Sequence, residues 1–405
     1  MEHRQLGKSG LRVSLLSFGA MTVGESQGFM KGVTSTEAEA RRVLDRAIDA
    51  GMDTIDTANV YSEGNSEELL GKWLEGKRDR VTLATKCRFP TSGLGAAVAP
   101  HDQGLSRKAI LRACEASLRR LRTDHVDLYQ VHMQDRSVPI EETLEALTDL
   151  VRAGKALYVG CSNYAGYRLV ESLWAADRRH LVPYASIQMQ WSIAAREGER
   201  ELVPAARAFG LGILAWSPLA RGFLTGKYRR GAAPPEGSRL AAWQDTWRTF
   251  DVERCWRVLD AVRAVAERIG STPSAVSLAW LLGRPGGGEA VTRRGGRGAP
   301  RGAGRDRRHP GAAGARGAAD HPRGARRGRG RGRARGGRRD PAGRGAAGRR
   351  PGPVGRRGPH PRAGGHARPA RRPARRGARH RDPRVAAAGA RVTRRRRATR
   401  APAPR

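Results

Sequence analysis

The segment Asp53-Thr54-Ile55-Asp56-Thr57-Ala58-Asn59-Val60-Tyr61 decides the fold class of this 405-residue sequence. Its apolar run predicts a strand over 53–58, with polar residues gathered at the strand's end. An amphipathic stretch, 35–50, precedes this strand and another, 63–75, follows it, and a glycine comes directly after each of them, as it often does after helices. A strand between two helices is the repeating unit of a parallel sheet.

The same alternation continues outward from this unit in both directions. Further strands are predicted at 13–20, 81–86, 126–132, 156–163, 185–191 and 212–218. Further helices are predicted at 106–122, 139–153, 166–178, 199–209, 251–269 and 273–283. Leu6–Leu11 predicts a hairpin turn before the first strand. An open, doubly wound sheet is the alternative, but Phe18–Gly24 lacks the glycine spacing of a dinucleotide fingerprint. The pattern therefore favours an α/β fold of the (β/α)8 TIM-barrel class.

Four short motifs resemble those of the aldo-keto reductases. Asp56-Thr57-Ala58-Asn59-Val60-Tyr61 is similar to the family's D-T-A-x-x-Y signature. Ala84-Thr85-Lys86, Tyr129-Gln130-Val131-His132 and Gly160-Cys161-Ser162-Asn163 follow in family order at the ends of later strands. The resemblance covers residues 3–284, and His101–Arg107 is closest to the aryl-alcohol-dehydrogenase-like branch. It implies NADPH-dependent reduction of an aldehyde or ketone.

The resemblance places a catalytic tetrad on Asp56, Tyr61, Lys86 and His132. Taken singly, each has a plainer explanation as a cap, a surface charge or a core histidine; together, at strand ends, they favour catalysis. Tyrosine has an ordinary pKa near 10, so a nearby ammonium is needed to favour its phenolate. Asp56 would balance the charge of a buried Lys86, and His132 would donate a hydrogen bond to the substrate carbonyl.

The family also implies a cofactor site for NADP(H). Ser162, Asn163 and Gln188 match positions that bind the nicotinamide carboxamide, and Trp191 matches an aromatic that stacks on the ring, or else is a large core residue. The segment 217–228 resembles the family's S-P-L-x-x-G-x-L-T-G-K-Y loop over the cofactor pyrophosphate. Its expected cofactor contacts are Ser217, Pro218, Leu219, Gly222, Leu224 and Lys227.

The composition changes abruptly after Arg284. Residues 285–405 contain 38 arginines and five acidic residues, and only nine residue types in all. Such a segment cannot bury enough apolar surface to offset its conformational entropy, so a disordered basic tail is predicted. The domain boundaries are therefore 1–284 for an incomplete barrel and 285–405 for the tail. The barrel is expected to lack strand 8 and its helix, since 286–305 contain no apolar run.

Two explanations fit the tail: a genuine segment that binds nucleic acid, or translation of a GC-rich gene in a shifted frame. The second is favoured, because Arg, Gly, Ala and Pro all have codons beginning with two G or C bases. One codon choice for Gly288–Arg297, read one base later, encodes Val-Arg-Pro-Ser-Pro-Val-Val-Gly-Ala, which is a good strand. The chain as written is then expected to be unstable or inactive.

The four cysteines show no CxxC spacing, so neither a metal site nor a disulfide framework is expected. No signal peptide and no membrane span are apparent, which favours the cytoplasm. A small carbonyl compound is the expected partner. The alternatives are a cofactor-binding sensor or accessory subunit without turnover, and nonspecific binding of nucleic acid by the tail, which lacks aromatic residues for base stacking. The substrate and the oligomeric state stay open.

Overall fold

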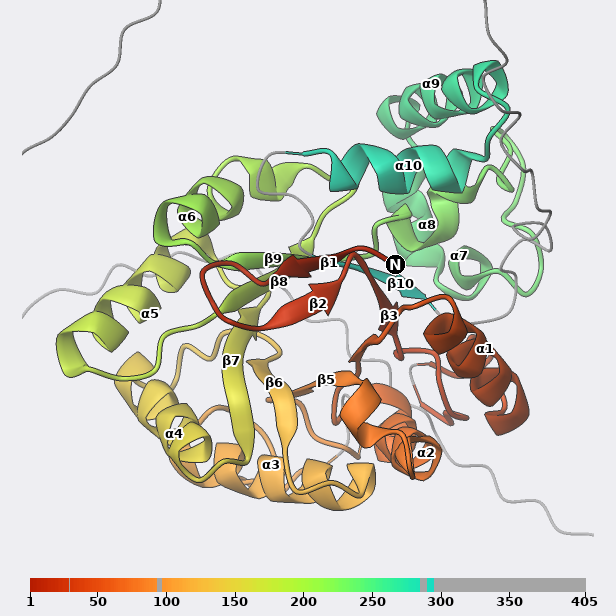
Figure 1. Cartoon of the computed structure of the whole chain (residues 1–405). Coiled ribbons are helices and arrows are strands. Elements are labelled where there is room, and N and C mark those ends of the chain that lie inside the picture. The colour runs from red at the N-terminus through yellow and green to blue at the C-terminus, as the bar shows by residue number, and fades with distance from the viewer. Residues whose placement is uncertain (29, 93–96, 285–289, 295–405) are drawn as a thin grey trace, which may run out of the picture. The chain divides into compact units, whose positions relative to one another are not determined.

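The computed structural model describes residues 1–28, 30–92, 97–284 and 290–294. In these ranges, eight parallel strands form a closed barrel, each hydrogen-bonded to its two neighbours. Figure 1 shows helices around the outside of these strands. The strands in spatial order are β10 (Ala290–Arg294), β3 (Leu16–Gly19), β4 (Thr54–Asp56), β5 (Thr82–Cys87), β6 (Val126–Val131), β7 (Ala156–Ser162), β8 (Ser186–Gln190) and β9 (Gly212–Trp216).

The predicted barrel class is confirmed, but one position differs from the prediction. The barrel was expected to lack its eighth strand, whereas β10 occupies that position and pairs in parallel with both β3 and β9. That expectation rested on the lack of an apolar run, but strand pairing itself uses backbone groups, and Val291-Thr292 is a β-branched pair that favours strands. The expected missing helix and the basic tail beyond Arg294 lie outside the described residues.

The amino-terminal segment differs from the predicted single strand over 13–20. It divides into β2 (Arg12–Ser14), which forms an antiparallel hairpin with β1 (His3–Gln5), and β3, which enters the barrel. The expected turn lies between the hairpin strands, where the Leu6 amide donates to the Leu11 carbonyl at 2.8 Å. The hairpin therefore precedes the barrel in the chain.

Helices follow the strands as the periodicity predicts. They are α1 (Glu37–Asp49), α2 (Asn65–Leu74), α3 (Arg107–Leu121), α4 (Ile140–Arg152), α5 (Gly166–Arg179), α6 (Leu202–Phe209), α7 (Arg239–Ala242), α8 (Gln244–Phe250), α9 (Glu253–Arg268) and α10 (Pro273–Leu282), with short 3-10 helices η1 (Tyr61–Gly64), η2 (Arg78–Arg80), η3 (Glu197–Glu199) and η4 (Ala220–Thr225). No helix within the described ranges is long and apolar enough to cross a membrane.

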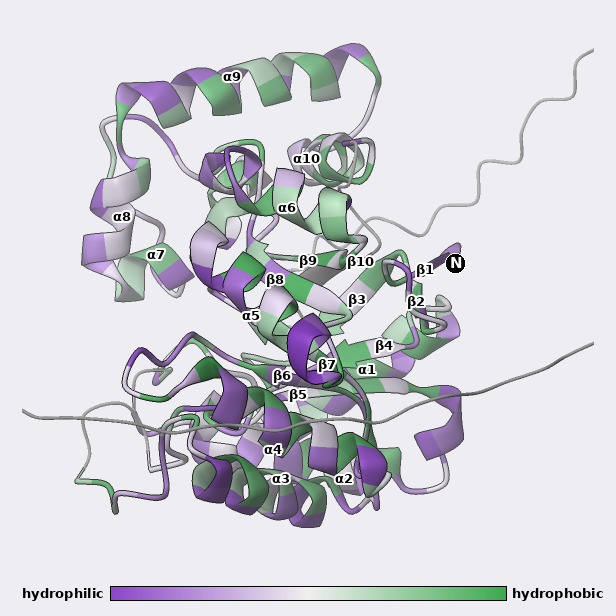
Figure 2. Ribbon diagram, turned by 90° about the vertical axis from the view of Figure 1, so that its left-hand side faces the viewer, coloured by the Kyte–Doolittle hydropathy of each residue, from purple (hydrophilic) through white to green (hydrophobic). Residues whose placement is uncertain are grey.

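The core lies between the strands and the helices that cover them. Figure 2 shows hydrophobic residues along the strands and hydrophilic ones on many outward helix surfaces. Helix α1 shows how the local sequence starts a helix and buries one face of it. Thr36 and Glu39 form a reciprocal capping box at its start, and Leu44 is fully buried on its inner face. A second apolar cluster, separate from the main core, is formed by Ala194 and by buried residues of the segment 220–259. The scaffold therefore fixes both the strand ends and the long loop after β9.

Candidate active site

The four predicted tetrad residues lie at the carboxyl ends of three adjacent strands. Asp56 ends β4, Lys86 is the penultimate residue of β5, and His132 directly follows β6. Tyr61 begins η1, five residues beyond Asp56. Catalytic groups of (β/α)8 barrels are found at this end.

The ammonium of Lys86 is the centre of the site. It donates to Asp56 Oδ2 at 2.6 Å, to the Thr57 carbonyl at 2.8 Å and to the Tyr61 hydroxyl at 3.3 Å. The Lys86 side chain has no exposed surface. Burial acts to lower the pKa of Lys86, but Asp56 and Tyr61 together raise it above its ordinary value. The lysine is therefore charged, and its three acceptors satisfy all three of its protons.

Burial dominates the ionisation of Tyr61. It raises the pKa of the phenol above its ordinary value of 10.0, and the field of Lys86 is the largest effect in the opposite direction. The direction of the lysine effect was predicted from the sequence, but here burial exceeds it. The phenol accordingly carries its proton near neutral pH and can act as an acid.

The second oxygen of Asp56 is held by two glutamines. Gln130 Nε2 and Gln188 Nε2 donate to Asp56 Oδ1 at 3.0 and 2.9 Å. Gln130 was not predicted from the sequence, although a polar side chain on a buried strand was a usable signal. Gln188 was expected to bind a carboxamide; with its nitrogen on Asp56, it keeps Oε1 for such a ligand. The carboxylate is therefore fixed on both oxygens.

His132 is a neutral side chain beside Tyr61. The two ring centroids are 5.6 Å apart in an edge-on arrangement. Burial, followed by the charges of Lys86 and Arg88, holds the pKa of His132 well below its ordinary value. Its Nδ1 is buried with no hydrogen-bond partner among the described residues. A tautomer with the proton on Nε2 leaves a lone pair at Nδ1 and makes Nε2 a donor.

The predicted carboxamide ligands lie next to this histidine. Asn163 Nδ2 donates to the His132 carbonyl at 2.9 Å and to Ser162 Oγ at 3.0 Å. Trp216 Nε1 donates to Asn163 Oδ1 at 3.0 Å. These bonds fix the side-chain amide of Asn163. The backbone of Asn163 has a φ of 52°, in the left-handed region. Trp216, at the end of β9, was not predicted from the sequence.

Trp191 lies deeper than a ring-stacking role suggests. It is 1% exposed, belongs to the main core, and donates from Nε1 to Glu199 Oε1 at 3.0 Å. These contacts match the alternative interpretation of a large core aromatic. Stacking on a nicotinamide ring stays a prediction.

The segment 217–228 forms a tight loop after β9. Ser217, Ala220, Arg221 and Gly222 all have positive φ. Its other predicted cofactor residues differ in depth: Leu224 and Pro218 are buried, Leu219 is half-buried and Lys227 is exposed. Leu224 packs in the second apolar cluster, and the Leu219 carbonyl accepts from the Gly222 amide at 2.9 Å. The loop is therefore anchored by its apolar residues.

Arg221 in this loop and Arg239 after it supply positive charge. The guanidiniums of Arg221 and Arg239 lie 5.3 and 5.2 Å from the ring of Trp243, and Arg221 is also 5.9 Å from the ring of Trp216. Burial lowers the pKa of Arg221, and no carboxylate in the described part of the chain pairs with it. A partly desolvated cation without a counter-ion fits a phosphate-bearing cofactor. Neither arginine was predicted from the sequence.

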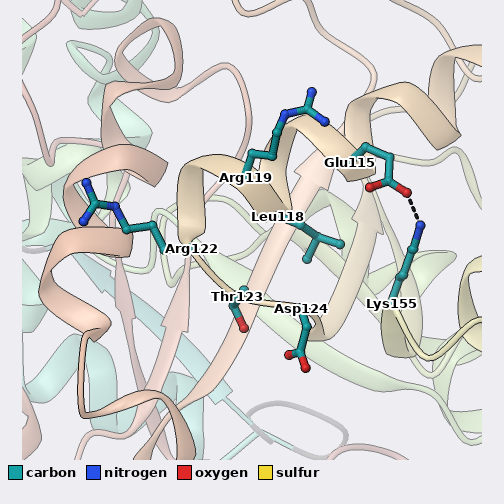
Figure 3. A pocket seen from close by; sticks show the side chains of 7 residues that line it. All are labelled: Glu115, Leu118, Arg119, Arg122, Thr123, Asp124 and Lys155. Atoms are coloured by element: carbon teal, nitrogen blue, oxygen red, sulfur yellow. Dashed lines mark hydrogen bonds and ion pairs between the residues drawn. The ribbon is translucent and has the colours of Figure 1, made fainter.

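A surface hollow of about 570 Å³ lies elsewhere on the molecule. Figure 3 shows the ion pair of Lys155 with Glu115 at its edge. Its residues lie near the amino ends of β6 and β7, the opposite end of the barrel from the tetrad; they are Glu115, Leu118, Arg119, Arg122, Thr123, Asp124 and Lys155. The hollow contains none of the predicted site residues.

Comparison with known proteins identifies a family for this chain. The model described as "Aldo/keto reductase family" matches residues 15–293. "Uncharacterized oxidoreductase YrpG" of Bacillus subtilis (strain 168) is 39% identical over 293 residues, 70% of this chain and 84% of the relative. "Probable voltage-gated potassium channel subunit beta" of Arabidopsis thaliana is 36% identical over 291 residues, again 70% and 84%. "Putative aryl-alcohol dehydrogenase C977.14c" of Schizosaccharomyces pombe is 38% identical over 239 residues, 54% of this chain and 68% of the relative.

Proposed function

The chain belongs to the aldo/keto reductase family, and on that premise we propose that it reduces an aldehyde or ketone to an alcohol with NADPH. The observation that carries the proposal is the position of the Lys86 ammonium, 2.6 Å from Asp56 Oδ2 and 3.3 Å from the Tyr61 hydroxyl. This arrangement stabilises the phenolate that remains when Tyr61 gives up its proton. The reaction is reversible.

Each tetrad residue has a separate task in this proposal. Tyr61 donates its proton to the substrate oxygen as negative charge develops there. His132, neutral and turned edge-on to Tyr61, donates a hydrogen bond from Nε2 to the same oxygen. Lys86 stabilises the tyrosinate, and Asp56 holds Lys86 in place. Because the substrate oxygen receives this proton as its negative charge develops, a free alkoxide need not form.

NADP(H) is the proposed cofactor and supplies the hydride. Ser162, Asn163 and the free Oε1 of Gln188 would bind the carboxamide, which has both donors and acceptors. The loop 217–228, including Arg221, would bind the phosphates together with Arg239. A preference for NADPH over NADH belongs to the proposal and is measured by comparing kcat/KM for the two.

The test uses the purified full-length chain with 4-nitrobenzaldehyde and follows the loss of NADPH absorbance. Tyr61→Phe removes the proton donor and is expected to lower kcat by about 10²–10⁴-fold. Tyr158→Phe is the matched control, because this half-buried tyrosine on β7 packs against the small cluster around Leu6 and Leu128, outside the site. Equal rates for the two variants would refute the assignment of Tyr61. A normal wild-type rate would also contradict the impairment that the sequence predicts from the loss of strand 8.

An accessory subunit that binds the cofactor without turnover is the second candidate. The relative named as a potassium channel subunit favours it, whereas the complete tetrad geometry favours an enzyme. Tight NADPH binding by the wild-type chain, with no consumption in the presence of a panel of aldehydes, would support the second candidate.

A further inference from the structure

Arg88 and Phe89 follow directly after β5 and lie beside His132. Arg88 has a φ of 125°, a conformation that residues with side chains rarely adopt. The following residue is tied to the tetrad turn, because Asn59 Nδ2 donates to the Phe89 carbonyl at 2.7 Å. Strained backbone of this kind gathers at functional sites where the surrounding structure holds it.

Three successive contacts lead from the proton donor to a cation. The ring of His132 lies 5.6 Å from that of Tyr61 and 5.2 Å from that of Phe89, edge-on in both cases. The guanidinium of Arg88 lies 4.8 Å from the Phe89 ring. Three aromatic rings, those of Tyr61, His132 and Phe89, therefore lie in a row, and the positive charge of Arg88 lies at its end.

Only one nitrogen of the Arg88 guanidinium is hydrogen-bonded within the described ranges. Its Nε donates to the Gln134 carbonyl at 3.2 Å, and within the described ranges its terminal nitrogens have no hydrogen-bond partner. Asp135 is close enough to be affected by its charge. However, the Asp135 carboxylate already accepts from the Leu105 amide and from the amide and hydroxyl of Ser137, at 2.6 to 3.1 Å. Arg88 therefore retains donors for a ligand.

We propose that Arg88 and Phe89 form a substrate subsite that selects aromatic aldehydes or ketones carrying a carboxylate. The carbonyl oxygen would bind at Tyr61 and His132, the substrate ring would pack against Phe89, and the carboxylate would accept from the terminal nitrogens of Arg88. Aromatic rings favour such offset or edge-on contacts, and guanidinium–carboxylate pairs are often bidentate. The inference rests on the proposed function of the tetrad.

The test compares 4-carboxybenzaldehyde with its neutral methyl ester, methyl 4-formylbenzoate, as substrates of the full-length chain. The ratio of kcat/KM for the acid to that for the ester is expected to fall about tenfold in Arg88→Gln. Arg122→Gln is the matched control, because Arg122 also has a positive φ, 54°, but lies in the hollow at the opposite end of the barrel (Figure 3). An unchanged ratio in Arg88→Gln, or an equal fall in both variants, would overturn the proposal.

A binding measurement separates this inference from the proposed function. Calorimetric titration of the NADP+-loaded chain with 4-carboxybenzaldehyde and with the ester needs no turnover. Tighter binding of the acid that Arg88→Gln abolishes would support the subsite even if the wild-type chain reduced neither compound, and only the proposed reaction would then fail. Equal binding of the acid and the ester by the wild-type chain would overturn the subsite, whatever the rates are.

Discussion

At the scale of single residues, the Lys86 ammonium lies between Asp56 and Tyr61 and acts directly on the phenol. The proposed function implies that Tyr61 acts as a base in alcohol oxidation, so we expect the rate to rise as pH passes the pKa of its phenol. Burial already raises that pKa, and Lys86 opposes the rise. Lys86→Met should therefore move the rising limb of the pH–kcat profile to higher pH and lower kcat at neutral pH by about 10²–10⁴-fold.

The matched control for this variant is Lys155→Met. Lys155 is a half-buried residue that pairs with Glu115 at the opposite end of the barrel. The Lys155→Met variant should leave the pH–kcat profile unchanged. A Lys86→Met profile with the same midpoint as wild type would show that the ammonium does not act on Tyr61.

His132 gives a second residue-scale prediction, on stability. Its folded-state pKa lies well below 6.5, so below pH 6.5 the unfolded chain binds a proton that the folded chain does not. The wild-type free energy of unfolding should then fall by about 1.4 kcal/mol per pH unit below 6.5, in addition to changes shared with His132→Gln. Denaturant unfolding of both proteins between pH 5 and 7 measures this difference. Parallel curves would mean that His132 is protonated in the folded state.

Motif spacing could predict which four residues form the tetrad, but not which residues hold them in place. Asp56 and Tyr61 are five residues apart in a recognisable signature. Gln130 joins Asp56 only because the register of β5 and β6 aligns it with Lys86. Register depends on the closed barrel, so the sequence order alone could not show that two glutamines share one carboxylate. Arg221 and Arg239, likewise, lie beside the same ring of Trp243 only because of the fold of the long loop.

At the scale of elements, the packing of α2 on α3 depends on Gly71. A Cβ at this position would lie 2.2 Å from the Arg120 carbonyl oxygen and 2.8 Å from the Leu121 carbonyl carbon, both backbone atoms. Glycine to alanine inside a helix normally gains about 1 kcal/mol, whereas overpacking costs about 1–3 kcal/mol. Gly71→Ala should therefore destabilise the fold, as measured by a lower denaturation midpoint.

Gly283→Ala is the control for that substitution. Gly283 caps α10 with a φ of −83°, and a Cβ at this position would meet nothing closer than the Ala279 carbonyl oxygen at 3.4 Å. Its midpoint should stay near that of wild type. Stabilisation by Gly71→Ala would mean that α2 and α3 separate readily to admit a methyl group.

Helix and strand positions were predictable because hydrophobic periodicity is local. The helix predicted over 139–153, for example, is α4, Ile140–Arg152. The strand predicted over 13–20 breaks into β2 and β3 because Arg12–Ser14 pairs with His3–Gln5. That pairing is a tertiary choice, and the apolar run itself does not reveal it.

At the scale of the whole molecule, closure of the barrel depends on a strand that lies within the segment of changed composition. Strand β10 forms parallel pairs with Leu16–Gly19 on one side and with Leu214 and Ala215 on the other. A barrel without it would expose the edges of β3 and β9. This strand could not be predicted from the sequence, because five residues of mixed polarity carry little periodic signal.

Thr292→Pro tests whether this closure holds the molecule together. Proline removes a backbone donor inside the strand and fixes φ, which disrupts the ladder between β10 and its neighbours. The variant should unfold at a lower temperature and lose NADPH-dependent reduction, because β3 and β9 carry or adjoin the site at their carboxyl ends. The same exchange at Thr393, within the basic tail, controls for proline itself and should match the wild-type chain in both measurements. If Thr292→Pro also matched wild type, the barrel would have to be stable without its eighth strand, and the remaining seven strands would have to position the tetrad by themselves.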